Sequence, residues 1–305
     1  MKMFLCFVFA VCVGAAQPRV TFVSNSADGL GWIAFGGLAT MYGSGLSSST
    51  ASARAVPLPK VLGGVELLIC AGVMFPDRPC PAAPLLYVSP DQINFQIPVD
   101  APAFDANMYL RQNGTTSGPF RLSTIYNSAP TVFRMGYDCS IDPRFPDGGS
   151  PCGLNAAAKE RRAPLRGAIT DQAGSVVTSL KPARVGQYYS MWLTGVGRYA
   201  TNGQPTSRIS ITLSDVPAYG YPNSTFTTAE ISYIGPSSYP GLDQINFRIP
   251  LTIMGRTDVP YPPLHPCGDY RLELSIEVAA QGLNVIRDAP RLPVEIRRGD
   301  VLCAQ

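Results

Sequence analysis

Hydrophobic and polar residues alternate along several short segments of the chain. Residues 93–97 place isoleucine or phenylalanine at every second position, with asparagine and glutamine between them, and residues 245–249 repeat the alternation. A period of two is typical of a strand with one buried face. Pro98 and Pro250 end these strands, because proline has no N–H to donate to a ladder. Further strands are expected at residues 65–69, 108–112, 208–213, 227–233 and 271–278. A helix signal occurs only at residues 156–162, so an all-β fold is predicted.

The two alternating segments belong to an internal repeat. Asp91–Pro98 and Asp243–Pro250 both read Asp-Gln-Ile-Asn-Phe-x-Ile-Pro, with seven of the eight positions identical. Residues 39–46 and 189–196 match more weakly at nearly the same offset. Such self-similarity indicates a duplicated unit. We expect two tandem immunoglobulin-like antiparallel β-sandwiches with short disulfide-stapled loops, at residues 17–135 and 166–305, joined by a cysteine-containing linker at 136–165.

The repeated motif is interpreted as structural. Phe95 and Phe247 are expected to fill the cores of the two sandwiches. Asp91 and Asp243 precede strands, where an aspartate side chain accepts backbone N–H bonds in a turn. The alternative for these two aspartates is the carboxylate pair of a secreted polysaccharide hydrolase, which would have to face each other across a cleft.

Mid-strand asparagines and aromatic rings supply the candidate contacts. Asn94 and Asn246 stand where asparagine is unfavourable, so each is expected to hydrogen-bond a neighbouring loop backbone, with ligand contact as the alternative. Trp192 shares strand parity with Tyr188 and is opposite in parity to Met191, so it is expected to face outward. Trp192 and Tyr188 are the candidate contact residues for a sugar or a protein.

The first 16 residues have the pattern of a secretory signal peptide. A positive start at Met1-Lys2 is followed by the apolar run Met3–Val13 and by the small residues Gly14-Ala15-Ala16. The run is too short to cross a bilayer, so cleavage after Ala16 and no remaining membrane span are expected. The alternatives are a retained helix or lipid attachment at Cys12. The signal predicts a secreted or cell-surface, extracytoplasmic protein.

Six cysteines remain after signal cleavage. In an oxidising compartment they suggest three disulfides, for which 15 pairings are possible. Two pairs flank short segments rich in proline and glycine, and this leaves the last two cysteines together. The expected disulfides are Cys70–Cys80, Cys139–Cys152 and Cys267–Cys303. A zinc site with the single histidine, His265, is the alternative, but no Cys-x-x-Cys occurs.

Composition and motifs exclude several functions. Lys and Arg number 24 against 21 Asp and Glu without a basic block, so no nucleic-acid partner is expected. Neither phosphate-binding glycine motif is present, and no cofactor is predicted. A Ser-His-Asp or Cys-His catalytic arrangement would have to use the single histidine, so nucleophilic catalysis is not expected. Asp138, Asp142 and Asp147 lack the spacing of a calcium loop, so no metal is predicted, with calcium as the alternative.

The repeat motif and its flanks carry a resemblance to a known family. Residues 87–98 read Tyr-x-Ser-Pro-Asp-Gln-Ile-Asn-Phe-x-Ile-Pro, and they are preceded by Tyr-Gly-Ser-Gly-Leu at 42–46 and Leu-Pro-Lys-Val-Leu-Gly-Gly-Val at 58–65. The chain resembles the uncharacterised Solibacter-type C-terminal domain of secreted acidobacterial proteins over residues 30 to 298. The resemblance implies a bacterial, extracytoplasmic protein with two immunoglobulin-like halves similar to the immunoglobulin-plexin-transcription-factor fold. The six mature cysteines are additions to the family pattern.

Together these observations predict a secreted module without enzymatic activity. Its expected roles are adhesion, surface assembly, or binding of a protein or glycan at the cell surface. A polysaccharide-active hydrolase that uses paired carboxylates is one alternative, and a purely structural extracytoplasmic scaffold is the other.

Overall fold

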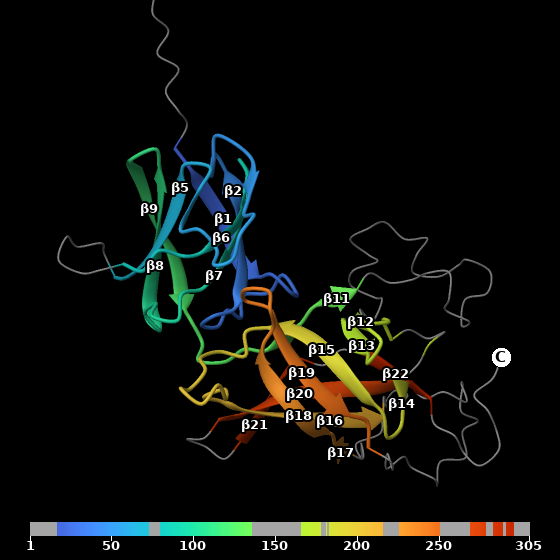
Figure 1. The fold of residues 1–305 in the computed structure, drawn as a ribbon. Helices are drawn as coiled ribbons and strands as arrows, with labels where there is room; N and C mark the ends of the chain where they lie inside the picture. Colours follow the sequence, from blue (N-terminus) through green and yellow to red (C-terminus); the bar gives the residue numbers. More distant parts are fainter. Residues whose placement is uncertain are drawn as a thin grey trace, which may run out of the picture.

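The structure is a computed structural model that describes residues 17–72, 80–135, 166–177, 181, 183–215, 226–250, 269–278, 283–288 and 291–295. These ranges form 22 strands and no helix (Figure 1). Strand pairs are antiparallel except those of β22 (Arg291–Glu295) with β12 (Arg166–Gly167) and β14 (Ala183–Arg184). The prediction of an all-β antiparallel fold is confirmed. The signal peptide, the linker at 136–165 and the helix signal at 156–162 lie outside the described residues.

Two sheets are built from the first half of the chain. One has the order β1-β2-β7-β6-β3, and the other has the order β4-β5-β8-β9. The strands of the first sheet are β1 (Arg19–Asn25), β2 (Leu38–Ser44), β7 (Gln92–Gln96), β6 (Leu85–Val88) and β3 (Ala51–Ser52). Those of the second are β4 (Val61–Leu62), β5 (Val65–Ala71), β8 (Phe104–Gln112) and β9 (Thr115–Thr124).

The β8–β9 hairpin turns at Asn113-Gly114. Both residues have positive φ, 46° and 87°. Two consecutive left-handed residues are the signature of a type I′ turn, whose twist matches that of the flanking strands. Asparagine and glycine reach this conformation most readily, which explains the choice of residues.

Inward-facing residues of these two sheets form the N-terminal core. Met41, Ile93 and Phe95 from the first sheet and Leu67 and Met108 from the second are fully buried in one cluster. Burying each of these side chains contributes about 1.5 to 3 kcal/mol to the free energy of unfolding. The apolar residues that alternate along 93–97 therefore help to hold the two sheets together.

Two further sheets are built from the second half. The first has the order β10-β15-β19-β18, with β13 also paired to β15, and the second has the order β11-β12-β22-β20-β16-β17, with β14 paired to β22 and β21 to β20. The strands of the first are β10 (Thr131–Val132), β13 (Ile169–Asp171), β15 (Tyr188–Thr194), β18 (Glu230–Pro236) and β19 (Asp243–Arg248). The remaining strands are β11 (Arg134–Met135), β16 (Arg208–Asp215), β17 (Phe226–Thr228), β20 (Asp269–Val278) and β21 (Leu283–Asp288).

A separate C-terminal core lies between strands of this second half. Met191, Ile245 and Phe247 from the β15–β19 pair are buried together with Ile211 of β16 and Val132 of β10. Residues 131–135 belong to this second half, because β10 pairs with β15 and β11 pairs with β12.

The two halves meet at a hydrogen-bonded junction. The Leu38 N–H donates to Thr194 Oγ1 at 2.7 Å, and that hydroxyl donates to the Gly241 carbonyl at 2.7 Å. The Arg198 guanidinium lies over the Phe35 ring, 3.4 Å from its centroid. Each such hydrogen bond contributes about 1 kcal/mol to stability. Together these contacts hold the start of β2 in the first half against the end of β15 in the second.

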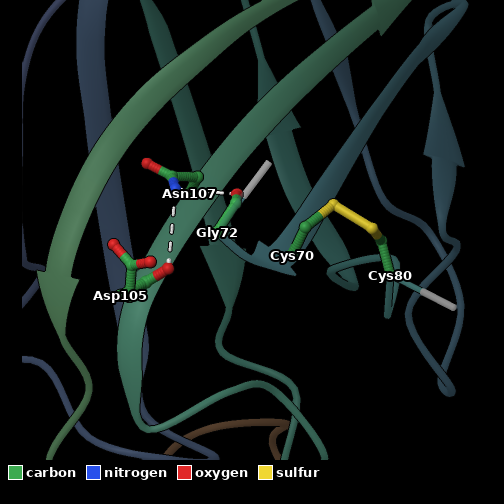
Figure 2. Close-up of a disulfide and its surroundings, with 5 residues drawn as sticks. All are labelled: Cys70, Gly72, Cys80, Asp105 and Asn107. Atoms are coloured by element: carbon green, nitrogen blue, oxygen red, sulfur yellow. Dashed lines mark hydrogen bonds between the residues drawn. A yellow bond between two sulfur atoms is a disulfide. The ribbon is translucent and has the colours of Figure 1, made fainter. Parts of the chain in front are cut away.

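A disulfide joins Cys70, near the end of β5, to Cys80 (Figure 2). Across the sheet from Cys70, the Asn107 side-chain amide donates to the Gly72 carbonyl at 2.8 Å and holds the chain as it leaves β5. The cysteine pairs expected at 139 with 152 and at 267 with 303 lie outside the described residues.

Candidate binding face

Strand β15 separates a buried face from an outward face. Met191 and Leu193 are fully buried, whereas Tyr188, Ser190 and Trp192 are half-buried on the opposite side. This alternation follows from the pleat of the strand, and it places Trp192 where its parity predicts.

The indole of Trp192 is held in one orientation. Its Nε1–H donates to Thr170 Oγ1 on β13 at 3.1 Å. On the other side, Trp192 stands directly opposite Gln244 of β19. Opposed side chains on one sheet face have Cβ atoms about 5 Å apart, so the ring and the amide share one patch of surface.

Next to Trp192, the side chains of Gln244, Asn246 and Ser190 form a hydrogen-bonded group. Gln244 Nε2 donates to Asn246 Oδ1 at 2.7 Å, and Ser190 Oγ donates to the same oxygen at 2.8 Å. In the first half, Gln92 Nε2 likewise donates to Asn94 Oδ1 at 2.7 Å. The prediction that both asparagine side chains bond a loop backbone is therefore wrong. Each bonds instead to the glutamine two residues before it on the same face of the strand.

A second aromatic ring borders this group on β18. Tyr233 stands opposite Asn246, beyond a bulge in the β18–β19 pairing, and it is 42% exposed. Its hydroxyl donates to the Pro236 carbonyl at 2.9 Å. The ring covers Gly235, because a Cβ at that position would collide with it. We name the outward patch formed by Trp192, Tyr233, Gln244 and Asn246 the Trp192 face.

Charged groups at one end of this sheet balance each other. Arg248 lies opposite both Tyr188 and Glu230, with its guanidinium 5.7 Å from the Tyr188 ring centroid and 3.8 Å from the Glu230 carboxylate. A hollow of about 240 Å³ is lined by Thr228, Glu230, Arg248 and Pro250. The expected contact residue Tyr188 is thus engaged with Arg248 beside this hollow.

Asp243 accepts a backbone N–H as expected, but it is buried at the start of a strand and not in a turn. It is 6% exposed at the start of β19, where Tyr199 donates its hydroxyl proton to Oδ1 at 2.8 Å and the Val196 N–H donates to Oδ2 at 3.0 Å. Burial raises the pKa of Asp243 to about 6, although these hydrogen bonds oppose the rise. Burial and the Asp243 charge also raise the pKa of Tyr199 above its ordinary value. Through these two hydrogen bonds, Asp243 holds the 195–199 loop against β19.

Asp91 occupies the matching motif position but has a different environment. It is exposed, and Ser89 Oγ donates to its carboxylate at 2.5 Å in the turn before β7. One carboxylate of the pair is thus in solvent and the other is enclosed by protein donors. Asp91 and Asp243 do not present the two accessible carboxyl groups that glycoside hydrolysis requires.

The first half presents a set of residues like that of the Trp192 face. Tyr42 of β2 stands opposite Gln92, and Tyr87 of β6 stands opposite Asn94 beyond a bulge in the β6–β7 pairing. Phe22 of β1, half exposed, stacks on Tyr42 with ring centroids 4.6 Å apart. We name the patch formed by these five residues the Tyr42 face.

Sequence reasoning missed the two glutamines and the flanking tyrosines. Gln92 and Gln244 were visible as the outward-facing, identical positions of the repeat, because strand parity separates them from the buried isoleucines. Tyr87 and Tyr233 also recur ahead of the motif in both halves. Strand parity does not show which way they face, since a bulge precedes each of them and shifts their register against the neighbouring strand.

Metal-binding clusters and membrane-spanning helices were the remaining features expected or excluded from the sequence. No three His, Cys, Asp or Glu side chains lie close enough together there to bind a metal ion. The acidic residues 138, 142 and 147 and the histidine at 265 fall outside the described ranges. Among the residues that the structure describes, no helical segment has the length and hydropathy of a membrane span.

Comparisons with known proteins match the chain to solved structures, and the similarity is distant. No family model and no curated protein matches the chain. Among solved structures, the chain is similar to the Escherichia coli adhesin FdeC, with 10% identity and a TM-score of 0.24. The match covers 92% of this chain and 65% of the FdeC chain, so this chain spans less than two thirds of that structure's length. A similarity at this TM-score does not bear on function.

Proposed function

We propose that the chain is a secreted, non-enzymatic module of two tandem immunoglobulin-like sandwiches that binds a protein or glycan at a cell surface, in adhesion or surface assembly. The observation that carries the proposal is the Trp192 face, where two partly exposed aromatic rings border a pair of side-chain amides on a rigid sheet. Aromatic rings provide large contact areas at low entropic cost, and fixed amides supply directional hydrogen bonds. A face built this way binds a partner without needing a catalytic group.

Several observations support the tandem arrangement. Each half has one large buried core of its own, and the strand order β2-β7-β6 of the first half is matched by β15-β19-β18 in the second. The motif strands β7 and β19 occupy the centre of this order in both halves. The N-terminal signal pattern supports an extracytoplasmic location.

The proposal is tested by adherence of beads coated with the mature protein to bacterial and host cells. Trp192→Ala is expected to lower adherence roughly tenfold, because an aromatic anchor at the centre of an interface contributes about 1.4 kcal/mol or more. Phe104→Ala is the matched control, since Phe104 is 76% exposed on β8, in a different sheet.

Three results would contradict the proposal in different ways. Equal adherence of the Trp192 and Phe104 variants would place the contact elsewhere. Turnover of polysaccharides that is lost in Asp91→Asn or Asp243→Asn would favour the hydrolase. Absence of adherence to every surface would favour the structural scaffold.

A further inference from the structure

We infer that the chain binds uncharged carbohydrate at two equivalent sites, one on the Trp192 face and one on the Tyr42 face. This inference rests on the proposed binding function and adds to it the ligand class and a second site. Its starting point is that both faces hold the same four elements in the same register, namely a glutamine, an asparagine and an aromatic ring on each neighbouring strand.

The amide pair has the same orientation in both halves. In each, the glutamine Nε2 donates to the asparagine Oδ1 at 2.7 Å. In the described residues, the asparagine Nδ2 donates no hydrogen bond to protein and the glutamine Oε1 accepts none. Each face therefore offers one fixed donor beside one fixed acceptor, at the spacing of residues i and i+2 on a strand, about 7 Å between Cα atoms.

Aromatic rings flank the amide pair on both sides. Trp192 and Tyr233 do so in the second half, and Tyr42 and Tyr87 do so in the first. A sugar ring suits this arrangement, because its C–H face packs on an aromatic ring while its hydroxyls both accept from the asparagine and donate to the glutamine. A peptide strand is less suited, since its backbone groups are satisfied at a sheet edge instead of a sheet face.

The charges favour an uncharged ligand. None of the residues of the Tyr42 face is charged. Near the Trp192 face, Arg248 is balanced by Glu230 at 3.8 Å. Anionic ligands such as phosphates are held by charge-assisted bonds from arginine or lysine, and no residue of either face is an arginine or a lysine.

The retention of outward residues indicates more than packing. The core requires only the isoleucines and the phenylalanine of the repeated motif, which are buried in both halves. The outward position next along the strand differs, being Gln96 in β7 and Arg248 in β19. The glutamine and asparagine are nevertheless the same in both halves, together with the bond between them.

The test uses the whole mature protein and isothermal titration with soluble hexasaccharides of β-1,4-glucan, β-1,3-glucan, β-1,4-mannan and β-1,4-xylan. Wild type is expected to bind two molecules of at least one hexasaccharide per chain. Trp192→Ala and Tyr42→Ala should each leave one site, and the double variant should bind none. Trp192→Phe and Tyr42→Phe keep a ring and should retain two sites, while Phe104→Ala should match wild type. Melting curves of all variants verify that each is folded.

Each result has a distinct meaning. One site in wild type, lost in Trp192→Ala and unaffected by Tyr42→Ala, would overturn the second site and leave the proposed function standing. No binding to any hexasaccharide, together with cell adherence that depends on Trp192, would overturn the carbohydrate assignment alone. No hexasaccharide binding and no adherence would overturn both. On the immobilised polysaccharide whose hexasaccharide binds, Trp192→Ala and Tyr42→Ala should each be retained at least tenfold more weakly than wild type, because linked sites act with avidity of about 10²- to 10⁴-fold.

Discussion

Replacing a core phenylalanine in one half should unfold that half before the other. Phe95 and Phe247 are both 0% exposed and belong to separate cores. Truncation of a buried phenylalanine to alanine costs about 3 to 5 kcal/mol. For Phe247 the lost contact with Tyr189, whose ring lies 6.4 Å away, adds about 0.5 to 1.5 kcal/mol. At roughly 4 °C per kcal/mol for a unit of about 100 residues, the affected transition should fall by about 12 to 20 °C for Phe95→Ala and by about 14 to 26 °C for Phe247→Ala.

Differential scanning calorimetry of the two single variants measures this effect. Phe95→Ala should lower one transition and Phe247→Ala the other, while Phe104→Ala, which alters an exposed side chain, should change neither by more than about 0.5 kcal/mol. If both core variants shift one common transition equally, the halves unfold as a unit through the Thr194 and Arg198 junction. If neither variant shifts any transition, the assignment of these phenylalanines to cores is wrong.

Two further predictions concern Asp243 and the loop beside it. The pKa of Asp243 is about 6 in the folded protein against 3.8 for the free side chain. Folding therefore favours the protonated carboxyl, so the free energy of unfolding is highest below pH 4 and about 3 kcal/mol of it is lost as the pH rises through 6. Denaturant titrations from pH 4 to 7 should show that loss in wild type and not in Asp243→Asn; the same slope in both would refute it. Gly197 has a φ of +105° and a Cβ there would overlap the Asn127 carbonyl, whereas Gly203, at φ +77°, has open space. Gly197→Ala should therefore destabilise the protein by more than the roughly 1 to 2 kcal/mol expected for Gly203→Ala, and equal unfolding free energies would contradict this.

Local patterns in the sequence were enough to predict the two motif strands and the direction of their outward side chains. The alternation around Phe95 and Phe247 has a period of two, and the pleat converts that period directly into one buried and one exposed face. The outward direction of Trp192 follows from the same parity. These features depend only on neighbours along one strand, which is why they can be predicted without knowing the rest of the fold.

The environment of each motif residue was decided by tertiary structure. Asp91 and Asp243 are identical in the repeat, yet one lies in solvent and the other is enclosed by Tyr199 and Val196, because the 195–199 loop covers only the second strand. The position of Tyr233 beside Asn246 likewise depends on a bulge and on which strand pairs with β19. Contacts between segments distant in sequence are set by how sheets and loops pack, and strand periodicity carries no information about them.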